Sequence, residues 1–344
     1  MTVPNHTSPV RLAVAGPRSP RFAFLRGPAP ILVSALLWGT IGTVSTLAPT
    51  DAPAAAIGCA GLSLGGILLF LTARGTRSLP RACTHPERWL LVLGAFAVAG
   101  YPVTFYPAVA RTGVAVSTVI ALGSAPIFVG LLAWATGQDR PTARWACATT
   151  AALLGCTFLV LGPELAGQGT PVDATGVVLA TGAGLSYACY SLIADRLITR
   201  GHPSDAVMGV LFGAAGMLVI PLVLSIDTHW LTTPRGATVA AYLALFTVYL
   251  AYRLFGYGLR HTTASTATTL TLTEPAVAAI LGINVLGERL PAASWCGLAV
   301  LAVGLLLLTA PLSACRRKDR PTGLSQLRSR RSGTGPSTQH QGRV

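Results

Sequence analysis

Ten apolar windows recur along the chain, each close to the roughly 20 residues that a helix needs to cross a lipid bilayer. Only 10% of all residues are charged, whereas soluble domains carry about 25%, so the chain cannot cover a water-facing surface of ordinary size. The pattern predicts an all-α integral membrane protein that embeds in the bilayer through ten spans. The windows are Pro30–Ala48, Ala54–Thr72, Trp89–Ala110, Val114–Thr136, Trp145–Leu161, Gly176–Ala194, Ala206–Ile226, Ala237–Leu259, Thr262–Leu286 and Ala292–Leu312.

The placement of arginine tests this count and predicts an orientation. The loops after the second, fourth, sixth and eighth windows hold nine arginines, whereas the other loops hold only Arg111, Arg235 and Arg289. Arginine and lysine gather in the cytoplasmic loops of membrane proteins. We therefore expect a multi-pass membrane protein with both termini cytoplasmic, and with Glu164 and Arg235 in external loops.

The net charge of +14 comes mostly from the two ends of the chain. Residues 1–29 and 313–344 together hold 12 basic residues and one acidic residue, and they are rich in Pro, Ser and Gly. These features predict a basic cytoplasmic tail at each end, the second one disordered. A basic stripe on a folded face is missing from the sequence pattern, so we expect no nucleic-acid partner.

An internal repeat relates the two halves of the chain. The stretch "SAPIFVGLLAWATGQDRPTARW" at 124–145 resembles "TEPAVAAILGINVLGERLPAAS" at 273–294. A constant offset of 149 residues pairs Pro126 with Pro275, Asp139 with Glu288, Arg140 with Arg289, Gly155 with Gly304, and Trp38 with Tyr187. We expect two five-helix repeats, residues 30–162 and 173–312. Because five is odd, the second repeat is inverted in the membrane, and because the first window belongs to the repeat, it is not a cleaved signal peptide.

The chain resembles the EamA-type branch of the drug/metabolite transporter superfamily. The resemblance rests on "ALLWGTIGTVST", "SAPIFVGLL", "TEPAVAAILGINVLGERL" and "GLAVLAVGLLLL", and it covers roughly residues 30–312. It implies a ten-helix carrier of the bacterial inner membrane that moves a small metabolite, often outward, through a lipid bilayer. Amino-acid-like, nucleobase-like and amphiphilic drug-like substrates all occur in that family. Inverted halves are typical of carriers that expose a central site to alternate sides.

Two alternatives to a secondary transporter are a membrane-embedded enzyme and a non-transporting scaffold or receptor. The sequence has no G-x-x-x-x-G-K-[ST] loop and no H-E-x-x-H motif, so we expect no enzyme activity and no cofactor. Seven scattered cysteines without C-x-x-C spacing predict neither a disulfide framework nor a metal site. The pattern says nothing about the oligomeric state.

Two charges lie inside predicted spans and are candidates for substrate contact. Glu274 lies about twelve residues into the ninth window, where a charge costs at least about 2.5–3.5 kcal/mol unless it faces protein or water. It is either a substrate-ammonium partner, a proton-coupling carboxylate, or a structural cap beside Pro275. Arg253 lies about seven residues before the cytoplasmic turn near Arg260, so its depth differs from that of Glu274 by roughly 7–8 Å. Its long side chain either approaches Glu274 or extends toward the cytoplasmic interface.

Aromatic rings and prolines in mid-span complete the predicted site. Aromatic side chains usually gather at the membrane interfaces, so rings at mid-depth predict a pocket or tight helix packing. The candidates for substrate binding are Trp38, Tyr101 and Tyr187, with Tyr106 and Tyr252 also in mid-span. Breaks in the helices are expected at Pro102, Pro126 and Pro275. The GxxxG pairs Gly61/Gly65 and Gly209/Gly213 predict close helix packing.

Overall fold

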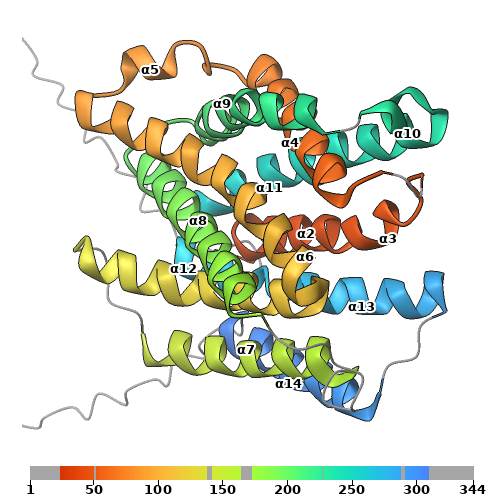
Figure 1. Ribbon diagram of the computed structural model, residues 1–344. Coiled ribbons are helices and arrows are strands. Elements are labelled where there is room, and N and C mark those ends of the chain that lie inside the picture. The colour runs from red at the N-terminus through yellow and green to blue at the C-terminus, as the bar shows by residue number, and fades with distance from the viewer. Residues whose placement is uncertain are drawn as a thin grey trace, which may run out of the picture. The chain divides into compact units, whose positions relative to one another are not determined.

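The computed structural model describes residues 24–49, 52–137, 142–163, 173–226, 228–287 and 291–309, and the elements formed by these residues are helical (Figure 1). Ten helical segments in this part of the chain are long and apolar enough to cross a membrane, which confirms the predicted fold class. Residues 1–23 of the first basic tail, the whole second basic tail, Glu164, and the segments containing Asp139–Arg140 and Glu288–Arg289 lie outside the described residues. The elements are α2 (Pro28–Gly39), α3 (Ile41–Ser45), α4 (Ala54–Thr72), α5 (Leu79–Ala82), α6 (His85–Ala135), α7 (Ala143–Pro163), α8 (Ala174–Thr199), α9 (Ser204–Ser225), η2 (His229–Thr232), α10 (Pro234–Tyr242), η3 (Leu243–Leu250), α11 (Ala251–Leu259), α12 (Ala264–Leu270), α13 (Thr273–Leu286) and α14 (Ala292–Thr309).

Several spans are not simple single helices. The third and fourth run together as α6, with Gly113 as a non-helical residue at φ 81° and ψ 163°, a conformation that favours glycine. The first span divides into α2 and α3 at Thr40, and the eighth consists of α10, the π-helical segment η3 and α11. The ninth is broken at Thr271 and Leu272, between α12 and α13.

The last helix of each repeat packs against its equivalent, so that α7 and α14 lie side by side in the lower part of Figure 1. Gly155 of α7 packs against the backbone nitrogen of Leu301, while a Cβ atom on Gly304 would lie 2.7 Å from the backbone nitrogen of Ala152. Residues 301 and 152 are themselves 149 apart, so each half presents the same surface to the other. The glycine pair found in the sequence repeat therefore marks a reciprocal contact, as a two-fold relation between the repeats requires.

The second helix of each repeat also packs against its equivalent, and α4 and α9 lie together near the top of Figure 1. The predicted GxxxG glycines lie at close contacts. A Cβ atom on Gly213 of α9 would lie 2.5 Å from Phe70 of α4, and one on Gly65 of α4 would lie 2.5 Å from Val248 of η3. Small residues thus let the backbones approach, as expected for helices in lipid.

Tryptophans separate into two environments. Trp89, Trp134 and Trp295 lie near the ends of spans and are 64%, 59% and 53% exposed. This placement suits rings that meet the headgroup region of a bilayer. Trp38, by contrast, lies well inside the first span and is 6% exposed, so protein surrounds it.

Contacts between the ends of helices join loops that the arginine pattern assigns to one side. On the predicted cytoplasmic side, the ion pair Arg200–Glu87 (3.2 Å) joins the residue after α8 to the start of α6. On the same side, Trp145 Nε1 at the start of α7 donates to Ser265 O at the start of α12 (3.0 Å). On the other side, the ion pair Arg111–Asp173 (3.1 Å) joins the turn within α6 to the start of α8.

A candidate substrate cavity lined by aromatic rings

A cavity of about 130 Å³ lies between helices of both repeats, at the mid-span aromatic side chains. Most of its wall is aromatic or aliphatic, and the polar groups on it are hydroxyls, an indole and backbone. The lining residues are Trp38, Ile41, Gly58, Gly61, Leu62, Val98, Tyr101, Pro102, Tyr106, Tyr190, Phe212, Leu243, Thr247, Val248 and Tyr252. A larger hollow of about 430 Å³ lies between α7 and the part of α6 that follows Gly113. Its lining includes the exposed side chains of Ile127, Leu131 and Trp134, which suit a lipid-facing surface, so it is a poorer candidate for the site.

Part of the cavity wall is held by hydrogen bonds between helices. The Trp38 indole Nε1 donates to the backbone oxygen of Thr247 at 2.8 Å. Thr247 belongs to η3, and π-helical segments occur often at functional sites. The hydroxyl oxygens of Tyr190 and Tyr252 lie 3.3 Å apart. These bonds join α2, α8 and the eighth span around the cavity and hold the rings in place.

The rings form one connected cluster. The centroids of Phe212 and Tyr252 are 3.8 Å apart, and those of Trp38 and Tyr252 are 4.9 Å apart. Trp38 and Tyr187, which occupy equivalent positions in the two repeats, both pack against Phe255, at 5.6 and 6.5 Å between centroids. The structure thus brings these two predicted residues to one central cluster. Tyr187 lies behind the cavity wall, 3% exposed.

Two tyrosines on the wall have hydroxyls free for a ligand. The hydroxyls of Tyr101 and Tyr106 form no hydrogen bond with any of the described residues, although both side chains line the cavity. Tyr106 lies directly over Gly58, whose missing side chain makes room for the hydroxyl. An unmatched donor in an apolar enclosure costs free energy until a partner arrives. Both groups can therefore bind a polar substrate atom or water.

Glu274 lies beside this cluster, in the first turn of α13 where the ninth span is broken. Its carboxylate forms no hydrogen bond or ion pair within the described part of the chain. It interacts electrostatically with the hydroxyls of Tyr101, Tyr187 and Tyr252. A helix N-terminus favours negative charge, which explains how the site tolerates an unpaired carboxylate. Glu274 thus lies near the aromatic rings, and no basic side chain of the described residues forms an ion pair with it.

The break itself lies slightly before the predicted position. A proline ring clashes with the carbonyl four residues earlier, and the residue four before Pro275 is Thr271, where α12 ends. The Glu274 amide instead donates to the Thr271 carbonyl at 2.9 Å, in a tighter turn. The Thr271 hydroxyl accepts from Tyr187 at 2.9 Å and so ties the break to the aromatic cluster.

The structure differs from the prediction at the other two prolines. The helix α6 continues through Pro102 and Pro126, and its non-helical residue is Gly113. A proline in a membrane helix removes one hydrogen bond, and neighbouring groups can compensate without ending the helix. Pro102 contributes to the cavity wall. The predicted breaks at these two prolines are therefore corrected to continuous helix.

Arg253 is engaged away from Glu274. Its guanidinium donates to Asp205 at 3.0 Å and to the Tyr249 hydroxyl at 2.8 Å, and both charged side chains are 38% exposed. The sequence left open whether Arg253 approaches Glu274 or extends toward the interface, and it could not show that α9 begins beside α11. The structure therefore separates Arg253 from the other four predicted binding residues.

Sequence reasoning missed some residues of this region. Tyr190 and Phe212 line the cavity. Both are aromatic residues in mid-span, so the criterion that selected Tyr187 could also have selected them. Asp195 is a second acid inside a span: it is 7% exposed, and its Oδ1 atom has no hydrogen-bond partner in the described structure. Its position only four residues before the end of α8 made it resemble a loop residue.

Ten spanning helices, two inverted halves and a central cavity define a multi-pass membrane transporter of the inverted-repeat class. The comparisons identify the family within that class. The model of the EamA-like transporter family matches residues 25–161 and 174–310, once for each half. The chain belongs to the EamA-like transporter family, and its recognition from sequence motifs is confirmed.

Similar proteins agree with this assignment. The uncharacterized transporter YwfM of Bacillus subtilis is 40% identical over 283 residues, covering 81% of this chain and 92% of that protein. The threonine/homoserine exporter RhtA of Salmonella typhimurium is 28% identical over 298 residues, covering 85% and 93%. A crystal structure with 15% sequence identity aligns with a TM-score of 0.67 over 83% of this chain and 96% of the other, which supports the fold alone.

Proposed function

We propose that the chain is a secondary carrier that exports a small amino-acid-like metabolite by alternating access. The observation that carries this proposal is the unpaired Glu274 carboxylate beside a small, ring-lined cavity with two free tyrosine hydroxyls. A carboxylate inside a membrane protein costs free energy unless it serves a partner. An amino acid brings an ammonium group that supplies such a partner.

The cavity offers a complementary group for each end of such a substrate. The ammonium approaches Glu274 and the faces of aromatic rings, which attract cations when water is excluded. The substrate carboxylate accepts hydrogen bonds from the hydroxyls of Tyr101 and Tyr106. Trp38 forms a wall of the cavity, and Tyr187 supports Tyr101 from behind at 6.4 Å between ring centroids. Arg253, ion-paired elsewhere, has no direct role in this proposal.

The name of one relative supports both the substrate class and the direction. The Salmonella protein is called a threonine/homoserine exporter and aligns over 85% of this chain. The other substrate classes found among such carriers are nucleobase-like and amphiphilic drug-like compounds. They do not combine an ammonium group for Glu274 with a carboxylate for the tyrosine hydroxyls, as an amino acid does. We propose protons as the coupling ion, with Glu274 binding either a proton or the substrate ammonium during the cycle.

Counterflow in proteoliposomes tests the proposal. Vesicles loaded with unlabelled threonine or homoserine should accumulate the labelled compound transiently, and a membrane enzyme or scaffold would support no such exchange. Unlabelled nucleobases and lipophilic cations, added outside, should compete weakly. No counterflow of any small amino acid by well-folded protein, or stronger competition by one of the other two classes, would overturn the substrate assignment.

We also propose that the protein lies in the cytoplasmic membrane with both termini inside, and that the repeats extend over residues 30–162 and 173–312. The arginine asymmetry supports the orientation, and the loop contacts described above place loops of the same predicted side together. A reporter enzyme fused after residue 320 should be active in the cytoplasm. Periplasmic activity of that fusion would contradict the orientation.

A further inference from the structure

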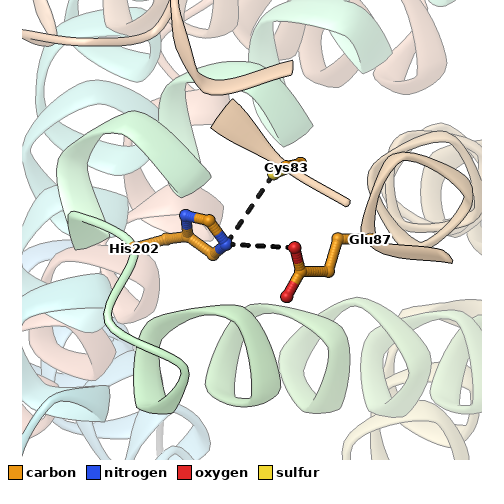
Figure 2. A group of neighbouring side chains, drawn as sticks. All are labelled: Cys83, Glu87 and His202. Carbon is orange, nitrogen blue, oxygen red and sulfur yellow. Dashed lines mark hydrogen bonds and ion pairs between the residues drawn. The ribbon is translucent and has the colours of Figure 1, made fainter. Parts of the chain in front are cut away.

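Three side chains with metal-binding atoms meet at one end of the molecule, away from the cavity. Cys83 follows α5, Glu87 lies in the first turn of α6, and His202 lies between α8 and α9 (Figure 2). The Cys83 sulfur lies 3.8 Å from His202 Nε2, and that nitrogen lies 3.5 Å from Glu87 Oε2. All three donor atoms lie within 4.8 Å of one another, and Figure 2 shows the side chains pointing toward a common centre.

The cluster is built by groups that are themselves held in place. The Glu87 carboxylate accepts from the Thr84 backbone amide at 2.9 Å, in a capping box that starts α6. Its other oxygen accepts from Arg200 at 3.2 Å. His202 lies next to Gly201, which has a φ of 98°. The Glu87 carboxylate is therefore oriented before any ligand binds, and bonds of this kind commonly orient metal ligands.

Burial makes the cluster unlike an ordinary surface group. Cys83 is 3% exposed, and the side chains of Glu87 and His202 are 10% and 16% exposed. The three donor atoms therefore belong to a largely buried group of side chains and not to a chance meeting on the surface.

We propose that Cys83, Glu87 and His202 form a binding site for a zinc ion. Zinc takes tetrahedral ligands at about 2.3 Å for sulfur and about 2.0–2.2 Å for nitrogen and oxygen, so neighbouring ligands lie about 3.6 Å (S to N) and about 3.4 Å (N to O) apart. For these two pairs the observed separations of 3.8 and 3.5 Å differ from the ideal ones by only a few tenths of an ångström, and the Cys83 and Glu87 donor atoms lie within 4.8 Å of each other. Thiol and imidazole ligands select zinc over magnesium and calcium, and water completes the coordination.

The charges and bonds at the site allow this ligand. Each carboxylate oxygen has two lone pairs: Glu87 Oε1 accepts from Arg200, and Oε2 accepts from the Thr84 amide and also faces His202, so it has a second lone pair for the ion. Binding zinc displaces the thiol proton, and the ion then neutralises two negative ligands. The Arg200 charge weakens the site but also fixes its carboxylate. A bound ion would join the start of α6 in the first repeat to the α8–α9 connection in the second.

Zinc binding to the purified full chain tests the proposal without any substrate, so its outcome is separate from that of the transport proposal. Metal analysis after gel filtration should find about one zinc per wild-type chain, with a weaker affinity, by about tenfold or more, in Cys83→Ser, His202→Gln and Glu87→Gln. Gln at 87 keeps the capping bond, so this variant folds. Matched controls are Cys147→Ser and His85→Gln, which remove an exposed cysteine and a neighbouring histidine.

Two further measurements identify the ligands. Cobalt, used in place of zinc, should give a thiolate-to-metal absorption band that Cys83→Ser abolishes. Zinc should raise the melting temperature of the wild type and of the two controls but not of the three site variants, because it binds the folded state. No stoichiometric zinc on the wild type, or unchanged binding in the Cys83→Ser and His202→Gln variants, would overturn the site.

Discussion

The fourth and ninth spans are equivalent in the two repeats, yet one is a continuous part of α6 and the other is broken into α12 and α13. Both carry the same proline, Pro126 and Pro275. The proline alone therefore does not decide whether the helix breaks. The neighbouring sequence differs: "ASTATTLTLTEP" leads to Pro275, whereas "AVSTVIALGSAP" leads to Pro126.

Hydroxyl groups explain the difference. In the ninth span, threonine hydroxyls donate to the backbone carbonyls of the preceding turn: Thr268 to Ala264 at 3.0 Å, and Thr271 to Thr268 at 2.9 Å. Side chains of this type satisfy carbonyls that a break leaves without a partner. At the position equivalent to Thr271, the fourth span has Leu122, which offers no such group, although Ser124 donates to Ala121 at 3.3 Å as Thr273 does to Leu270. The second repeat therefore has a hydroxyl at the break itself, and the first repeat lacks it.

The two spans also differ in charge. Glu274 stands where the first repeat has Ala125, so only the broken helix carries an acid beside its proline. The carboxylate occupies the first turn of a half-helix, a position that stabilises negative charge. The comparison indicates that the halves share a scaffold and divide the functional chemistry unequally.

The largest effect is expected from removing the acid. Glu274→Gln keeps the shape but removes the charge, and a hydrogen bond to a charged group contributes about 1.5–3 kcal/mol, or about 10- to 100-fold in substrate affinity. Counterflow of labelled threonine should fall by that factor at near-normal expression. The matched control is Asp173→Asn, which neutralises an exposed carboxylate outside the cavity. Normal counterflow with an unchanged pH profile in well-expressed Glu274→Gln would show that the acid is structural.

The second test asks whether the break matters. Pro275→Ala removes the clash with Thr271 and allows α12 and α13 to join, because proline costs about 3 kcal/mol in a helix interior. We expect higher thermal stability and a loss of counterflow of about tenfold, which corresponds to about 1.4 kcal/mol. Pro126→Ala should change transport less than about twofold, which is under about 0.5 kcal/mol. Equal effects of the two substitutions would remove the functional distinction between the spans.

A moderate effect is expected at the hydroxyl that ties the break to the rings. Thr271→Val leaves the buried Tyr187 hydroxyl without its acceptor, which costs about 1–3 kcal/mol of folding free energy. Thermal unfolding should detect this loss. Thr273→Val is the control, because that hydroxyl bonds only within its own turn, to Leu270. A similar loss in both variants would mean that the bond to Tyr187 adds little.

The smallest effect is expected at the charge far from the break. Arg253 and Asp205 form an ion pair in which both side chains are 38% exposed, and such pairs contribute about 0–1 kcal/mol. Arg253→Gln and Asp205→Asn should each leave the threonine KM within about twofold, or under about 0.5 kcal/mol. A large rise in KM for Arg253→Gln alone, with Asp205→Asn neutral, would return Arg253 to the binding site.

The sequence was sufficient for the fold class because hydrophobic length and a constant repeat offset each report on it directly; the orientation that arginine placement indicates stays a prediction. It also led to Trp38, Tyr101 and Tyr187, since rings in mid-span need a protein environment. It failed where the outcome depends on side-by-side packing. The Arg253–Asp205 pair depends on α9 meeting α11, and Cys83 and His202 are 119 residues apart.

The reciprocal contact between α7 and α14 has a consequence for motion. If a carrier works by exchanging the conformations of its two halves, a contact that the two-fold relation maps onto itself is the same before and after the exchange. Gly155 and Gly304 lie at such a contact, where backbone meets backbone with no space for side chains to slide. The two terminal helices would then be the stationary part of the cycle, and the movement that opens the cavity would have to occur among the remaining eight spans.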